Sequence, residues 1–436
     1  MKVMETPHRP GPPGPARPGP RRRGASPPLR GALVLVLATQ GPGLMVMLAD
    51  TDAGSVVTAA QSGASWGYSM LPLELALVPV LYLVMELTSR LGLTTGKGHA
   101  RLVLEHYGRR WAVASVALLF LTTTGALVTE LAGLSSVAAM EGVPPWLSVP
   151  AAALLLAIVV RLGTYRRVER VGVVLGLCEL AFVVAAVAAH PALRPMADSF
   201  VSTAAVHRPG YLAMVAANIG AVVMPWMVFY QQSAVVDKGW GPRDLRAARA
   251  DTAVGAVVTQ GVMVAVLIAT SAALGHGGAR EGALSSVPAI SAALVPALGH
   301  LGGRLAFEVG MAGAALVAAI VVSLAAAWAF SDLTRHRGSL NDSARRAPAF
   351  YGVYFASLAL AAAISLASGA GPALAITVEV GNALLLPLVL GSLLALARRA
   401  LPVPYRLGTA RTLVTSLVAL GAVGLNLALA WQVLGL

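Results

Sequence analysis

Carboxylates inside long apolar stretches are the residues best able to carry chemistry in this sequence. Asp50 and Asp52 lie near the centre of the first stretch, and Ser55 follows them. A charged side chain is costly in hydrocarbon and is retained mainly where it pairs or lines a cavity, so it marks a candidate functional site. Carboxylate, carbonyl and hydroxyl oxygens are the ligands that hard divalent cations prefer. The sequence therefore predicts a cation site in the middle of this stretch.

A proline interrupts the sixth apolar stretch. Pro225 has no N–H, so the carbonyl of Ala221, four residues earlier, loses its helical partner. If the two interrupted stretches pack together, Asp52 faces that carbonyl and the sulfur of Met224, a ligand that favours softer transition metals. Interrupted helices in corresponding positions of two halves are typical of transporters with an inverted repeat. Proline and glycine are also frequent in membrane helices, so a packing kink is the alternative at each interruption.

The composition indicates a polytopic membrane protein. Of the 436 residues 57% are apolar, and only 12% are charged, about half the share in soluble domains. So few charges cannot cover a soluble surface, which excludes an ordinary soluble domain and an intrinsically disordered chain. Eleven stretches approach or exceed the length of about 20 residues that a bilayer requires. They are residues 31–61, 66–92, 111–139, 146–163, 170–190, 211–236, 252–275, 303–331, 348–369, 372–397 and 412–434.

The basic residues indicate the topology. Of the 32 Lys and Arg residues, 28 precede the first stretch or fall in every second connection, and four fall in the others. The positive-inside rule then places the N-terminus in the cytoplasm and the C-terminus outside the cell membrane. The net charge of +13 is therefore explained by topology, and we expect the lipid bilayer, not nucleic acid, as the large partner.

The chain divides into four expected segments. The N-terminal segment contains nine prolines and an Arg-Arg-Arg run, which is typical of a disordered tail. The expected segments are a cytoplasmic tail (1–29), two five-helix repeats (30–190 and 211–398) and an eleventh helix (410–436). The one cysteine, Cys178, leaves no partner for an internal disulfide.

Three motifs surround the two interruptions. Residues 41–68 read GPGLMVMLADTDAGSVVTAAQSGASWGY, residues 86–98 read ELTSRLGLTTGKG, and residues 223–239 read VMPWMVFYQQSAVVDKG. They resemble the first, second and sixth helices of the Nramp family of divalent metal transporters, in which the first helix carries an Asp-Pro-Gly-Asn motif and the sixth a Met-Pro-His motif. The variant forms look closest to the branch that includes magnesium transporters. The resemblance implies an all-α membrane protein of the leucine-transporter type, with eleven helices, a 5+5 inverted repeat and broken first and sixth helices.

The resemblance also implies a metal site between the two broken helices. Asp52 stands at the metal-binding aspartate and Met224 at the thioether ligand, while the carbonyls of Ala49 and Ala221 stand at the backbone ligands. Ser55 replaces the ligand asparagine, and because serine is shorter we expect it to act through water. The metal is the transported substrate, and no cofactor is expected.

Further residues are expected to line this site or to take part in coupling. Trp226 replaces the histidine that the family associates with proton movement, and Gly133 has lost the second acid of the third helix. The resemblance therefore leaves coupling to protons open. The residues in this wider set are Asp50, Glu130, Glu379, Asn382, Trp226 and Gln231.

The expected function is import of a divalent metal by a monomeric secondary transporter. Met224 favours Mn²⁺ or Fe²⁺, whereas the loss of the asparagine and the second acid, Asp50, favour Mg²⁺, which gives up water reluctantly. A transporter of the same fold for an organic solute is the alternative. A membrane sensor or enzyme is a further one, although the sequence has no zinc-site spacing and no nucleophile–base motif.

Overall fold

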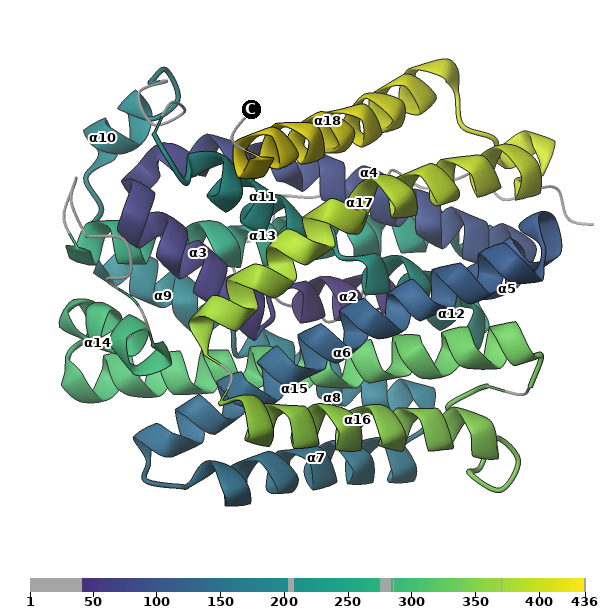
Figure 1. Cartoon of the computed structure of the whole chain (residues 1–436), viewed down its shortest axis with the longest axis horizontal. Helices are drawn as coiled ribbons and strands as arrows, with labels where there is room; N and C mark the ends of the chain where they lie inside the picture. The colour runs from purple at the N-terminus through teal and green to yellow at the C-terminus, as the bar shows by residue number, and fades with distance from the viewer. Residues whose placement is uncertain are drawn as a thin grey trace, which may run out of the picture. The chain divides into compact units, whose positions relative to one another are not determined.

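Helices make up all the regular structure in the described part of the chain. A computed structural model describes residues 41–202, 208–274, 284, 286–336, 338–369 and 371–434, so the predicted tail lies outside it. The helices (Figure 1) are α2 Pro42–Asp50, α3 Ala53–Trp66, η1 Gly67–Met70, α4 Leu71–Thr95, α5 His99–Tyr107, α6 Arg109–Met140, α7 Pro145–Leu162, α8 Tyr165–Leu177, α9 Leu180–Ala188, α10 Leu193–Asp198, α11 Tyr211–Val222, α12 Pro225–Asp237, η2 Pro242–Asp244, α13 Leu245–Leu274, α14 Val287–Leu298, α15 His300–Thr334, α16 Pro348–Ser368, α17 Pro372–Ala400, η3 Val403–Tyr405 and α18 Thr409–Leu434.

Ten segments of the described residues are long and apolar enough to cross a membrane. One of them, Ala53–Thr95, contains α3, η1 and α4, and so combines the second half of the first predicted stretch with the whole of the second. Separating these two parts recovers the eleven predicted stretches. The all-helical membrane fold is therefore confirmed, although residues 31–40 of the first stretch lie outside the described range.

Both predicted interruptions are present. Helix α2 ends at Asp50 and α3 begins at Ala53, whereas α11 ends at Val222 and α12 begins at Pro225. Figure 1 shows the short helices α2 and α12 among the longer ones, away from the edges formed by α18 and by α7 and α16. The site-bearing breaks are thus held inside the bundle, where α13 and α15 pack against α2.

The fifth predicted stretch, 170–190, corresponds to a single candidate span, Tyr165–Ala188, which consists of α8 and α9. Residues Cys178 and Glu179 form a tight turn between α8 and α9, in which the N–H of Glu179 bonds to Gly176 three residues earlier at 3.0 Å. Close approach of α15 accompanies this turn, because Gly313 packs directly on the Leu175 carbonyl. Cβ–Cβ crowding explains why glycine occupies that position: a Cβ there would lie 2.9 Å from the Cβ of Cys178.

Two contacts join distant connections, as expected if the basic segments share one side of the bundle. The Arg90 guanidinium reaches the Tyr405 carbonyl at 3.1 Å, and the Arg399 guanidinium lies over the ring of Tyr107. These contacts join the end of α4 to the segment before α18, and the end of α17 to the end of α5. Which side of the membrane this face meets stays a prediction from the charge rule.

Candidate metal site

Asp52 caps the second half of the broken first helix and keeps one oxygen free. Its Oδ1 accepts a hydrogen bond from the backbone N–H of Ser55 at 2.7 Å, which satisfies one of the unpaired donors at the start of α3. Its Oδ2 is buried and has no hydrogen-bond partner among the described residues. A buried carboxylate oxygen without a partner is costly, and a bound cation would satisfy it.

Ser55 connects the two breaks. Its hydroxyl donates to the carbonyl of Ala221 at 3.0 Å, which is the carbonyl that Pro225 is predicted to leave without a helical partner. The sequence predicts that Ser55 reaches the metal through water. The structure adds that two of the expected ligand oxygens, one from each broken helix, already lie side by side.

The other two expected ligands lie at the same breaks. Met224 is the residue immediately before α12, and Ala49 is in the last turn of α2. Each of the five expected ligands is at most 1% exposed, including Asp52, Ser55 and Ala221. In this structure the breaks are therefore closed to solvent, and a metal could enter only after helices move.

Glu379 reaches the break from α17. A Cβ on Gly54 would lie 2.5 Å from Oε1 of Glu379 and 3.3 Å from Oδ1 of Asp52, so the two carboxylates approach each other across the bare glycine. The side-chain amide of Asn382 donates to Oε2 of Glu379 at 2.9 Å and fixes its orientation. Gly220 lets α11 pack on α17, because a Cβ there would overlap the backbone carbonyl of Glu379.

Glu130 reaches the break from α6. Its Oε2 accepts a hydrogen bond from the backbone N–H of Ala53 at 3.1 Å. A proline at position 53, as in the family motif, would lack this donor. The hydrogen bond to Glu130 therefore depends on the replacement of that proline by Ala53. Gly133, one turn further along α6, packs closely against Ala53, because a Cβ at position 133 would lie only 2.7 Å from the alanine Cβ. This packing leaves no room for a second acid.

Three candidates from the wider set form no hydrogen bond with the residues at the two breaks among the described residues. The Gln231 amide donates to the hydroxyl of Ser89 at 2.6 Å, and so connects α12 to α4. Trp226 is fully buried in the first turn of α12, and its indole N–H has no partner among the described residues. Asp50 ends α2, is 1% exposed, and has no partner for either carboxylate oxygen within the same range.

Sequence reasoning missed the residue that positions α2. Asp251 of α13 accepts hydrogen bonds from the backbone N–H groups of Gly43 at 2.7 Å and Leu44 at 3.1 Å, and so caps α2 from a distant helix. Side chains at Gly41 or Gly43 would collide with this carboxylate. The Gly-Pro-Gly start of α2 indicates that another group packs closely against it. The sequence does not indicate that this group is the carboxylate of Asp251.

The arrangement supplies a mixed set of donors. Three carboxylates, on Asp52, Glu130 and Glu379, lie close enough to interact electrostatically, and carbonyl, hydroxyl and thioether groups lie beside them. Within the described ranges, no three His, Cys, Asp or Glu side chains form a ready-made metal cluster. The chemistry of the set fits a divalent cation, since its positive charge would offset the mutual repulsion of these acids.

The comparison that decides the family covers almost the whole described chain. Residues 43–432 match Nramp, the natural resistance-associated macrophage protein-like family. The chain belongs to the Nramp family. A relative from Klebsiella pneumoniae (strain 342), the divalent metal cation transporter MntH, is 26% identical over 304 residues, covering 68% of this chain and 72% of the relative. The MntH protein of Levilactobacillus brevis is 28% identical over 199 residues, or 44% and 42% of the two chains.

Solved structures confirm the fold of this Nramp protein. The Eremococcus coleocola manganese transporter, crystallised with an aromatic bis-isothiourea compound, superimposes with a TM-score of 0.73 at 18% identity, covering 92% of this chain and 88% of that one. A Na⁺-coupled sialic acid symporter superimposes with a TM-score of 0.57 at 14% identity, covering 84% and 85%. The fold is thus the leucine-transporter type expected from the sequence, and it is shared by proteins that carry different solutes.

Proposed function

We propose that this protein imports divalent metal cations across the cell membrane by alternating access. Its membership of the Nramp family and the transporters among its relatives support a transport role. The observation that carries the proposal is the hydrogen bond from Ser55 to the Ala221 carbonyl at 3.0 Å, which brings the two breaks together beside the free oxygen of Asp52. A cation held there would touch both broken helices at once.

Movement of the two broken helices would then expose the site to one side at a time. Helix α2 is only nine residues long and is separated from α3 by the break, so it can move as a short rigid unit. The site is closed in this structure. We infer that the structure represents an intermediate between states open to either side.

We further propose that Mn²⁺ or Fe²⁺ is preferred to Mg²⁺. The thioether of Met224 is a soft ligand that binds transition metals better than magnesium. Glu379 adds a hard oxygen beside Asp52. This oxygen improves the binding of all divalent ions and so reduces the difference in affinity between the transition metals and Mg²⁺. The MntH relative is named as a divalent metal cation transporter and the Eremococcus coleocola relative as a manganese transporter, which supports the same order.

Uptake by the purified protein in proteoliposomes tests the proposal, with Mn²⁺ and Mg²⁺ measured in parallel. We expect Asp52→Asn to abolish uptake of both ions, because it removes the charge that binds the metal. Met224→Ala should lower Mn²⁺ uptake at limiting concentration about tenfold, the equivalent of one lost ligand contact, and leave Mg²⁺ uptake nearly unchanged. Thr377→Val, an exposed change on α17, is the control. Normal transport by Asp52→Asn, or uptake of neither ion by the parent, would contradict the proposal and favour an organic solute.

Proton coupling has its own readout in the same vesicles. Trp226 carries no group that titrates near neutral pH, so proton movement would depend on Glu130 or Glu379. We expect Mn²⁺ to enter without acidification of the vesicle interior. Acidification that accompanies uptake and is lost in Glu130→Gln would instead show coupling through that acid.

A further inference from the structure

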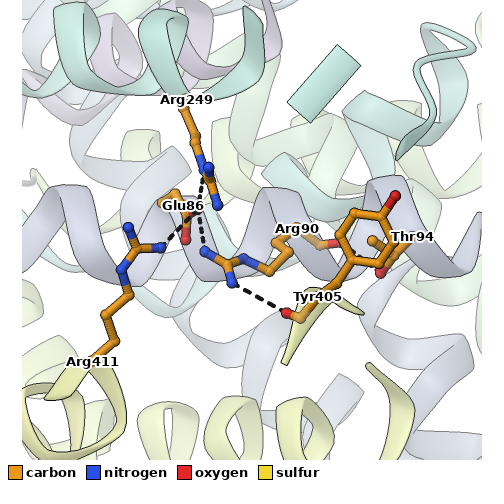
Figure 2. A network of polar contacts seen from close by, with 6 residues as sticks. All are labelled: Glu86, Arg90, Thr94, Arg249, Tyr405 and Arg411. Atoms are coloured by element: carbon orange, nitrogen blue, oxygen red, sulfur yellow. Dashed lines mark hydrogen bonds and ion pairs between the residues drawn. The ribbon is translucent and has the colours of Figure 1, made fainter. Parts of the chain in front are cut away.

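Three arginines converge on one carboxylate of α4 at the basic side of the bundle, and none of the four residues belongs to the candidate metal site. The Oε1 atom of Glu86 lies 2.5 Å from the guanidinium of Arg90, 2.6 Å from that of Arg249 and 3.7 Å from that of Arg411. Figure 2 shows the three side chains arriving from different elements, with Arg90 also bonded to the Tyr405 carbonyl. We call Arg90, Arg249 and Arg411 the arginine cluster.

The arginine cluster carries more positive charge than its surroundings neutralise. Three guanidinium groups share a single carboxylate, and no other acid forms an ion pair with them in the described part of the chain. The Arg90 side chain is only 4% exposed, and its Nε has no hydrogen-bond partner there. Glu86, which is itself buried, is the counter-charge of Arg90, and the other two guanidinium groups are partly exposed. The cluster therefore has two unmatched positive charges and open donors.

The geometry of the open donors suits an oxyanion. Guanidinium groups present planar pairs of N–H donors that match the oxygens of phosphate, and several of them together make a strong phosphate site. Arg249 and Arg411 are each partly exposed, at 34% and 49%, so an anion can reach them from outside. The tail cannot supply that anion, because residues 1–30 contain seven basic residues and one acid.

The surface beside the cluster is exposed and apolar, as expected of a surface that faces lipid. Arg411 lies in the first turn of α18, and exposed leucines follow it along this helix at positions 413, 417 and 420. Basic pockets between membrane helices on the cytoplasmic side are known binding sites for anionic headgroups. We propose that the arginine cluster binds a phosphate group, supplied either by an anionic phospholipid of the adjacent leaflet or by a soluble phosphate. The bound group would join α18 to α4 and α13. Helix α4 belongs to the first expected five-helix half and α13 to the second.

Lipid binding to the full-length protein tests this site. Native mass spectrometry of the protein extracted from vesicles of phosphatidylcholine and phosphatidylglycerol should show phosphatidylglycerol retained in preference. Arg249→Gln combined with Arg411→Gln should weaken that preference about tenfold or more, as expected for lost charge-assisted hydrogen bonds. Arg345→Gln removes one exposed charge from the same face and should have no effect. An unchanged preference in the double variant, or no preference in the parent, would overturn the proposal.

Two further experiments are needed. The first distinguishes a lipid phosphate from a soluble one, and the second distinguishes anion binding from a purely structural role of the cluster. If the lipid is the ligand, excess inorganic phosphate should fail to displace the phospholipid. If phosphate displaces the lipid and binds directly to the parent but not to the double variant, the same site binds a soluble phosphate. Glu86→Gln removes the only counter-charge that the described residues place on the cluster and should strengthen anion binding. If the cluster serves only to join helices, Glu86→Gln weakens thermal stability and leaves anion binding unchanged, which would also overturn the proposal.

Discussion

Asp52 has two separate tasks, because its two carboxylate oxygens face different partners. One oxygen accepts the Ser55 N–H and caps α3, and the other has no partner among the described residues. Asparagine is as good a cap as aspartate, but it lacks the charge that attracts a divalent cation. The helical and metal-binding tasks of this residue can therefore be separated by substitution.

We predict that Asp52→Asn keeps the stability of the parent and loses transport. Asp52→Ala should lose transport and also about 1 kcal/mol of stability, the usual cost of a missing cap. Melting temperatures of the detergent-solubilised proteins, combined with Mn²⁺ uptake, provide the measurement. Equal loss of stability in both variants would mean that the charge, not the cap, holds α3 in place.

His99 is a second residue whose surroundings can be tested, and it lies outside the candidate membrane spans. Its Nδ1 is 3.1 Å from the amide oxygen of Gln232, and its ring packs on Phe229. Burial lowers the pKa of His99 to about 4, below its ordinary value of about 6.5. The folded protein therefore keeps this histidine neutral at pH values where the unfolded chain would protonate it.

We predict that His99 makes the protein less stable as the pH falls from about 6.5 towards about 4. In this window the unfolded state binds one more proton than the folded state, so protonation favours unfolding, by about 2 kcal/mol at pH 5. The fall in melting temperature between pH 7.5 and pH 5 should be smaller in His99→Gln than in the parent. His336→Gln, at an exposed histidine, should behave like the parent.

At the scale of elements, the position of α2 depends on a contact across more than 200 residues. Asp251 of α13 accepts two backbone N–H groups at the start of α2, which are among the donors that a helix cannot satisfy itself. The carboxylate also interacts favourably with the positive end of the helix. Holding α2 in this way fixes the approach of Ala49 and Asp50 to the break.

We predict that Asp251→Ala loosens α2 specifically. Loss of a cap of this kind costs about 1 to 2 kcal/mol, and the effect should concentrate on residues 42–50. Hydrogen exchange measured by mass spectrometry should show faster exchange there, with transport reduced. Asp244→Ala, which removes a cap from the surface element η2, should leave exchange in α2 unchanged. Uniformly faster exchange would indicate general destabilisation instead.

At the scale of the molecule, the sequence predicts the breaks better than it predicts what surrounds them. An acid or a proline inside an apolar run is a local signal, which is why the interruptions at Asp52 and Pro225 can be predicted. The turn at Cys178 and Glu179 carries no such signal and accompanies close packing of α15. The approach of Glu379 to Gly54 depends on how α17 packs against α11 through Gly220, and no local pattern encodes that register.

The orientation of the whole molecule follows from charge alone and is the last prediction. The 28 basic residues should remain in the cytoplasm because they are hard to translocate. In a background of Cys178→Ser, Ser343→Cys lies on the basic side and Asp198→Cys on the other, both at exposed positions. A membrane-impermeant maleimide added to intact cells should label the cysteine at 198 at once and the one at 343 only after permeabilisation. The reverse order would invert the topology and with it the direction of transport that we propose.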